Sequence, residues 1–156
     1  MIDFAGVVES FHLSLSNSFS NIYLVVILNL FFIFATYTDL KYMKIYDKFN
    51  IVMLVTRLIT LVIFGFEKDW LLGGLVIFLT YLIIAMYTGD KMAGDIKFGG
   101  NIGLWMGFYP SILIVLLSVI TNLISRLFTG NKGKVPLAPF LYLAYIMLAV
   151  YFFKFV

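Results

Sequence analysis

The chain has 156 residues, of which 63% are hydrophobic and 12% are charged. Soluble domains carry roughly 25% charged residues, so this composition excludes an ordinary soluble fold and predicts an integral membrane protein with the lipid bilayer as its solvent. The net charge is +3, there is no cysteine and there is one histidine, which excludes disulfides and Cys-rich or His-rich metal sites. We expect no metal, no cofactor and no nucleic-acid partner.

The apolar stretches predict an all-α membrane protein. Residues 1–20 carry apolar side chains at helical spacing, which is typical of an amphipathic segment lying on the membrane surface. Residues 21–156 then form the polytopic membrane domain. A crossing helix needs about 20 apolar residues, so this length allows about six transmembrane helices. In chain order, we predict spans at 22–37, 51–66, 70–87, 95–109, 111–127 and 138–153.

The fourth of these spans is unusual because it is short. Its 15 residues reach about 22 Å as a helix, less than a hydrocarbon core of about 30 Å. It therefore either places Asp95 inside the membrane boundary or is only partly inserted. The segment also has a face of small residues, which allows a neighbouring helix to pack closely. These residues are Gly99, Gly100, Gly103 and Gly107.

Basic residues predict the orientation. The polar loops 39–50, 88–97 and 128–137 and their flanks contain most of the Lys and Arg residues, whereas the opposite side has only Lys68 and Lys154. By the positive-inside rule, the basic side is cytoplasmic and both termini are outside. Arg57 falls within a predicted span. It could pair with a carboxylate, bind a lipid head group or extend to the cytoplasmic side, and the sequence does not choose among these.

Two acids on the cytoplasmic side are the candidate catalytic groups. Asp39 closes the first span and Asp95 opens the fourth, and acids near the apolar zone are costly. Two carboxylates brought close together tend to share one proton, which gives one base and one acid in a single site, as in aspartic proteases. The competing interpretation is that each acid caps a helix or pairs with a lysine. Asp47 and Asp90 are weaker candidates on the same side.

The sequence around Asp95, MAGDIKFGGNIGLWMG, resembles the Gly-x-Gly-Asp motif of the type IV prepilin peptidases and archaeal preflagellin peptidases. Residues 94–97, Gly-Asp-Ile-Lys, match the order of that motif, while Met92 stands in place of its first glycine. Asp39 is followed by a basic stretch and Ile45, as in the family, but Tyr46 and Asp47 replace the usual Pro-Asn. The segment PLAPFLYLAY, residues 136–145, is similar to the entry of the family's last helix.

This resemblance implies an intramembrane aspartic endopeptidase in which Asp39 and Asp95 are the catalytic dyad. Gly94 and Lys97 are the neighbouring motif positions, where a substrate would approach. The implied substrates are prepilin-like membrane proteins, cut at the cytoplasmic face between a basic leader and an apolar helix. The implied location is the cytoplasmic membrane. Long family members add a domain with paired cysteines linked to methylation, whereas this chain resembles the short, single-domain form.

Three other functions compete with this one. A lipoprotein signal peptidase needs an aspartate after an Asn-containing motif such as GGNIG, and no aspartate follows Asp95. A small proton-coupled transport component would favour acids spread through the depth of the membrane. A catalytically inactive relative of the peptidases is also compatible with the incomplete motifs.

Overall fold

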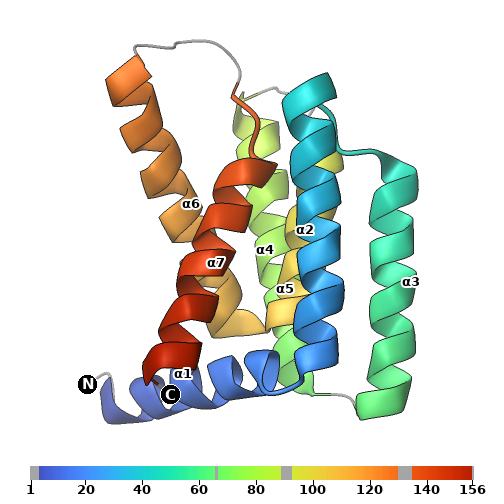
Figure 1. Cartoon of the computed structure of the whole chain (residues 1–156), viewed down its shortest axis with the longest axis vertical. Helices are drawn as coiled ribbons and strands as arrows, with labels where there is room; N and C mark the ends of the chain where they lie inside the picture. Colours follow the sequence, from blue (N-terminus) through green and yellow to red (C-terminus); the bar gives the residue numbers. More distant parts are fainter. Residues whose placement is uncertain (1–3, 66, 89–92, 130–134, 156) are drawn as a thin grey trace.

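The computed structural model describes residues 4–65, 67–88, 93–129 and 135–155, and in these residues every regular element is a helix (Figure 1). This confirms the predicted all-α fold. There are seven helices in the described residues: α1 (Phe4–Phe19), α2 (Ile22–Tyr42), α3 (Asp47–Phe64), α4 (Lys68–Thr88), α5 (Ala93–Met106), α6 (Phe108–Thr129) and α7 (Ala138–Phe155).

Three of these helices are long and apolar enough to cross a membrane, namely α2, α4 and α6. A shorter apolar helix covers Ala138–Lys154. Helix α5 has 14 residues, which corresponds to about 21 Å, so the short fourth segment predicted from the sequence is indeed short. Length and composition therefore support a membrane protein, and the count of six spans stays a prediction.

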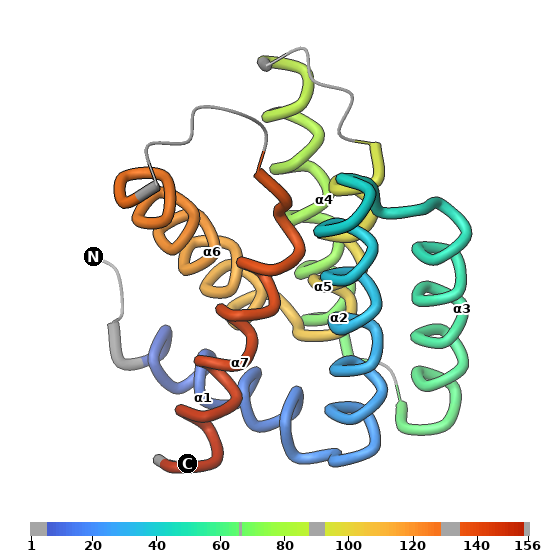
Figure 2. Tube along the Cα trace, turned by 45° about the horizontal axis from the view of Figure 1, so that its top comes forward, coloured from blue at the N-terminus to red at the C-terminus, as the bar shows by residue number. Residues whose placement is uncertain are grey.

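Helices α2 to α7 run alternately up and down, and α1 lies across one end of them (Figures 1 and 2). We call this the α1 end, and it also holds the C-terminal part of α7. The opposite end, the Asp39 end, holds the last turn of α2 and the first turns of α3, α5 and α7. The helix α1 is docked on the bundle, since Leu15 and Phe19 are buried in the main apolar core. In that core Phe32 of α2 stacks on Tyr145 of α7.

The connection between α2 and α3 is shorter than predicted. The polar run 39–50 was expected to be a loop, but α2 continues through Tyr42 and α3 begins at Asp47. The turn is made by Met43, which closes α2 in a left-handed conformation (φ 52°) and donates its N–H to the Asp39 carbonyl. Only residues 43–46 connect the helices, because a helix can continue beyond the point where its sequence stops being apolar.

Helices α4 and α5 pack with their backbones in contact. A Cβ atom added to Gly73 would lie 2.5 Å from the carbonyl carbon of Gly107, and one added to Gly103 would collide with the backbone of Gly73. Such close approach is possible only without side chains on both helices. The glycine-rich face predicted for the fourth segment is therefore confirmed, and its partner is α4.

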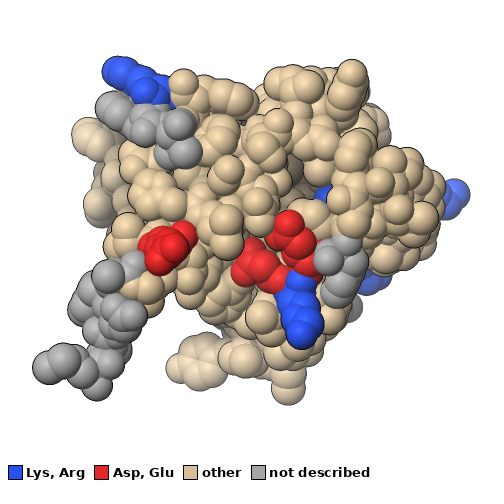
Figure 3. All heavy atoms as spheres, turned by 90° about the horizontal axis from the view of Figure 1, so that it is seen from below, with Lys and Arg blue, Asp and Glu red and all other residues tan. Residues whose placement is uncertain are grey.

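At the α1 end, α5 turns into α6 through a single residue, Gly107, whose φ of 79° favours glycine. Asp69 of α4 accepts hydrogen bonds from the Ser14 hydroxyl (2.6 Å) and the Phe108 N–H (3.3 Å), and so joins α1 to the start of α6. The Ser18 hydroxyl donates to the Met106 carbonyl (2.6 Å). Figure 3, which views the molecule from this end, shows acidic side chains among mostly uncharged atoms.

Arg57 of α3 is buried, with 1% of its surface exposed. Its Nε donates to the Leu104 carbonyl of α5 at 2.8 Å, and its guanidinium lies 4.1 Å from the ring centre of Trp70 and 5.3 Å from that of Trp105. None of the three predicted alternatives describes this arrangement: a backbone carbonyl and two aromatic faces hold the cation. Arg57 therefore ties α3 to α4 and α5.

Candidate active site

Asp39 lies in the last turn of α2 and is 4% exposed. Its Oδ2 accepts a hydrogen bond from the N–H of Ala138 at 2.8 Å, and Ala138 is the first residue of α7. A carboxylate at this position satisfies a free backbone donor and interacts favourably with the positive end of the helix dipole. The cap predicted as the competing interpretation of Asp39 is therefore present. It also fixes the orientation of the carboxylate.

Asp95 lies in the first turn of α5 and is half-buried. It lines a pocket of about 320 Å³ between the start of α5 and the connection from α2 to α3. The residues that share this pocket with Asp95 are Met43, Lys44, Ile45, Tyr46, Asp47, Ala93 and Gly94. The candidate acid is thus accessible from a polar hollow at the Asp39 end.

Gly94 makes the closest contact between the two segments. A Cβ atom added there would collide with the Ile45 carbonyl oxygen, so only glycine allows the α2–α3 connection to approach. The Gly94 carbonyl accepts a hydrogen bond from the Asn50 side chain (3.2 Å). In the structure the residue that approaches the Gly94 backbone is Ile45 of the same chain, and the predicted approach of a substrate at Gly94 stays a prediction.

Lys97 forms an ion pair with Asp47 at 2.7 Å between Nζ and Oδ1. The two side chains are 47% and 62% exposed, so water screens the pair and its contribution to stability is small. Asp47, one of the two weaker catalytic candidates, is therefore paired with a lysine. The second weaker candidate, Asp90, lies outside the described residues.

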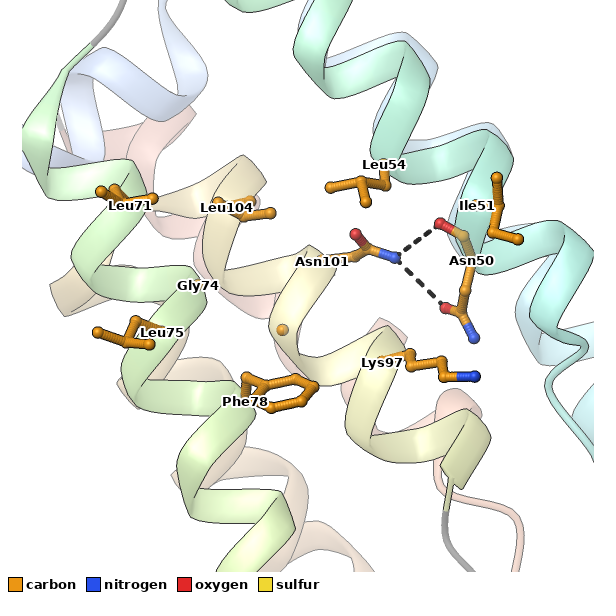
Figure 4. Close-up of a pocket in the computed structure, with 11 residues that line it drawn as sticks. Asn50, Ile51, Leu54, Leu71, Gly74, Leu75, Phe78, Lys97, Asn101 and Leu104 are labelled. Atoms are coloured by element: carbon orange, nitrogen blue, oxygen red, sulfur yellow. Dashed lines mark hydrogen bonds between the residues drawn. The ribbon is translucent and has the colours of Figure 1, made fainter.

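A mainly apolar groove of about 340 Å³ begins at Lys97 and follows α5 away from the Asp39 end (Figure 4). Helices α3 and α4 form its walls and α5 forms its floor. Inside it, the Asn101 side chain donates to the backbone and side-chain oxygens of Asn50 at 3.0 and 3.4 Å. The residues that line it are Asn50, Ile51, Leu54, Leu71, Gly74, Leu75, Phe78, Lys97, Gly100, Asn101 and Leu104.

Asn50 and Asn101 are site residues that sequence reasoning missed. Together they connect α3 to Gly94 and to the middle of α5, and so hold the segment that carries Asp95. A signal was present, because each is an amide within or beside a predicted apolar span. Buried amides need hydrogen-bond partners, and two such residues on neighbouring helices can satisfy each other.

The last turn of α2, which holds Asp39, and the first turn of α5, which holds Asp95, lie at the same end of the bundle (Figure 1). The chain leaves α2 four residues after Asp39, and that connection touches Gly94, the neighbour of Asp95. The start of α7 lies at the same place, because its first residue, Ala138, donates its N–H to Asp39. Gly94 and Asp95 line the same pocket, whereas Lys97 lines the neighbouring apolar groove and pairs with Asp47. The fourth predicted site residue, Asp39, is bonded to the start of α7.

A family model described as the type IV leader peptidase family matches residues 26–127. The matched region runs from α2 to α6 and contains both Asp39 and Asp95, while α1 and α7 lie outside it. No curated protein and no solved structure matches the chain.

Proposed function

Because the chain belongs to the type IV leader peptidase family, we propose that it is an aspartic endopeptidase that removes the basic leader of prepilin-like membrane proteins. The family makes it a leader-peptidase-type protease of the membrane. The finer assignment is ours: Asp39 and Asp95 form the catalytic dyad, and Gly94 and Lys97 lie along the path of the substrate.

One observation carries the choice of residues. The backbone of Gly94, next to Asp95, packs directly on the connection that follows the helix of Asp39. The segments that carry the two acids therefore meet at one end of the helix bundle. The family to which the chain belongs consists of aspartic-type proteases. The pocket beside Asp95 gives a peptide access to that acid.

Such a pair can hydrolyse a peptide bond without any other group. The ionised carboxylate takes a proton from water while the protonated one donates to the substrate carbonyl oxygen. The resulting hydroxide attacks the carbonyl carbon, and a proton returns to the leaving amine as the C–N bond breaks. The N–H of Ala138 holds one Asp39 oxygen throughout, which keeps that carboxylate oriented.

We further propose that the Asp39 end faces the cytoplasm, with α2 to α7 crossing the membrane, both termini outside and α1 at the outer interface. The distribution of cations supports this, since Lys68 and Lys154 belong to the α1 end. The described basic residues at the Asp39 end are Lys41, Lys44, Lys48, Lys97 and Arg126. Cleavage at the cytoplasmic face of the membrane follows from this orientation.

The distribution of acids argues against a proton relay. Among the described residues of α2 to α7, the Asp and Glu side chains occur in the first or last turns of helices and not in their middles. A relay needs ionisable groups through the membrane depth. A catalytically inactive relative is the alternative that experiment must exclude.

The test is leader cleavage in cells that co-express the chain with a prepilin-type substrate, followed by gel shift. We expect wild type to shorten the substrate and Asp39→Asn and Asp95→Asn to leave it uncut. Glu9→Gln, at an exposed acid of α1, is the control and should still cut. Cleavage by either dyad variant would refute the dyad, and an inert wild type would indicate an inactive relative.

A further inference from the structure

The hydroxyl of Tyr81 is buried in α4 and has no hydrogen-bond partner among the described residues. The residue is 5% exposed, so bulk water does not supply the missing partner. Burying a hydroxyl without a hydrogen bond is unfavourable, and nearly all buried polar groups in proteins are paired. The position therefore needs an explanation beyond packing, since phenylalanine would fill the same space without this cost.

The ring of Tyr81 lies against α5 at Gly99. A Cβ atom added to Gly99 would be 2.5 Å from Cδ2 of the ring, so the missing side chain makes room for the tyrosine. Asp95 is four residues before Gly99 and therefore on the same face of the helix. Ile96, the residue after Asp95, belongs to the same buried cluster as Tyr81, so the tyrosine lies beside the segment that carries the acid.

The residues around Tyr81 also connect it to Asp39. Tyr81 belongs to a buried apolar cluster with Ile77, Ala85 and Ile96, and Leu137 packs against this cluster. Leu137 precedes Ala138, whose N–H is bonded to Asp39. The cluster that contains Tyr81 thus contacts both the start of α5, which carries Asp95, and the residue before α7, whose first N–H is bonded to Asp39.

We propose that Tyr81 is a positioning residue that donates its hydroxyl hydrogen bond to the Asp95 carboxylate when a substrate occupies the site. This inference rests on the proposed function and adds a third residue to it. The hydroxyl does not react. It orients the carboxylate and stabilises its ionised form, because a donor favours the charged state of an acid.

Other charged groups lie at the same end of the bundle as Asp95. Lys44 and Asp47 line its pocket from the α2–α3 connection, Lys97 lies on its own helix, and Asp39 lies at the end of α2. All of these are unchanged when Tyr81 alone is replaced. A comparison of pH profiles between wild type and one variant therefore isolates the effect of the hydroxyl.

The experiment measures leader cleavage by the purified chain in detergent across a range of pH, for wild type, Tyr81→Phe and Tyr87→Phe. Tyr87 is on the same helix, 92% exposed, and serves as the matched control. For Tyr81→Phe we expect kcat to fall by about tenfold or more with KM unchanged. We also expect the acidic limb of its profile to move up by about one pH unit, because the ionised carboxylate loses a donor.

Thermal stability separates this role from a structural one. Removing an unpaired hydroxyl while keeping the ring should leave the Tm of Tyr81→Phe equal to or above that of wild type. A wild-type kcat and pH profile in Tyr81→Phe, or a lowered Tm, would overturn the inference while leaving the dyad intact. Absence of cleavage by wild type would remove the proposed function and this inference together.

Discussion

The Asp39 carboxylate accepts a hydrogen bond from the Ala138 N–H at 2.8 Å, across 99 residues of sequence. One side chain thus caps α7 and is also the first acid of the proposed dyad. The two roles make different demands. A cap needs only an oxygen acceptor, whereas acid–base catalysis needs a group that exchanges a proton.

Substitutions of Asp39 can therefore separate stability from activity. Asparagine keeps an acceptor oxygen and is a good N-cap, so Asp39→Asn should unfold close to wild type. Asp39→Ala loses the cap and should be less stable by about 1 kcal/mol. Both should fail to cut a leader. The measurements are chemical unfolding in detergent and the gel-shift assay, and equal stability of the two variants would show that the cap contributes nothing.

Gly94→Ala should damage both the fold of the site and cleavage. The added Cβ would collide with the Ile45 carbonyl and push the start of α5 away from the α2–α3 connection. We expect a loss of about 1–3 kcal/mol in unfolding free energy, typical of overpacking, and a large fall in cleavage. Val62→Ile adds one carbon at an exposed position of α3 and is the control. Wild-type behaviour of Gly94→Ala would mean that the contact relaxes freely.

Gly103→Ala tests the contact between α4 and α5. The new methyl group would meet the backbone of Gly73, which cannot rotate away as a side chain can. An unfolding free energy lower by about 1–3 kcal/mol is expected. Val150→Ile adds one carbon on the exposed side of α7 and should be neutral. If both variants unfold alike, the two helices are not held by this contact.

Arg57→Lys should be destabilising although the charge is kept. Lysine has neither the planar group that stacks on Trp70 nor the Nε donor to the Leu104 carbonyl. We expect a loss of about 2 kcal/mol, from a charged hydrogen bond and a cation–π contact. The two tryptophans of the chain both flank Arg57, so their fluorescence reports the change directly. The exposed Arg126→Lys is the control. If Arg57→Lys has the unfolding free energy of wild type, the contacts of Arg57 with Trp70 and Leu104 do not stabilise the fold.

The helices could be predicted from the sequence because apolar runs are local. The short α5, its glycine face and the grouping of cations at one end all follow from such runs. The ends of α2 and α3 could not be predicted in this way. Hydropathy locates where a chain is apolar, whereas Tyr42 and Asp47 are polar and still helical because backbone hydrogen bonds continue past the apolar stretch.

The partners of the buried polar residues could not be predicted, since they come from distant parts of the chain. Arg57 meets Trp70 and Leu104, and Asp39 meets Ala138, only after several helices have packed. The motif around Asp95 marked the candidate site, because Gly94 and Asp95 are neighbours in sequence. Tyr81 carries no motif, and it is distinguished by its position beside Gly99 and by its buried hydroxyl, which has no partner among the described residues.

The single-residue junction at Gly107 limits how Asp95 can move. The far end of α5 is joined to α6 by one residue, and Ser18 of α1 and Asp69 of α4 are hydrogen-bonded to this corner. We therefore expect any movement of Asp95 relative to Asp39 to be a swing of α5 about the corner and not a slide along its axis. In the orientation proposed above, the level of Asp95 across the membrane is then set at the opposite end of the short helix, some 20 Å away.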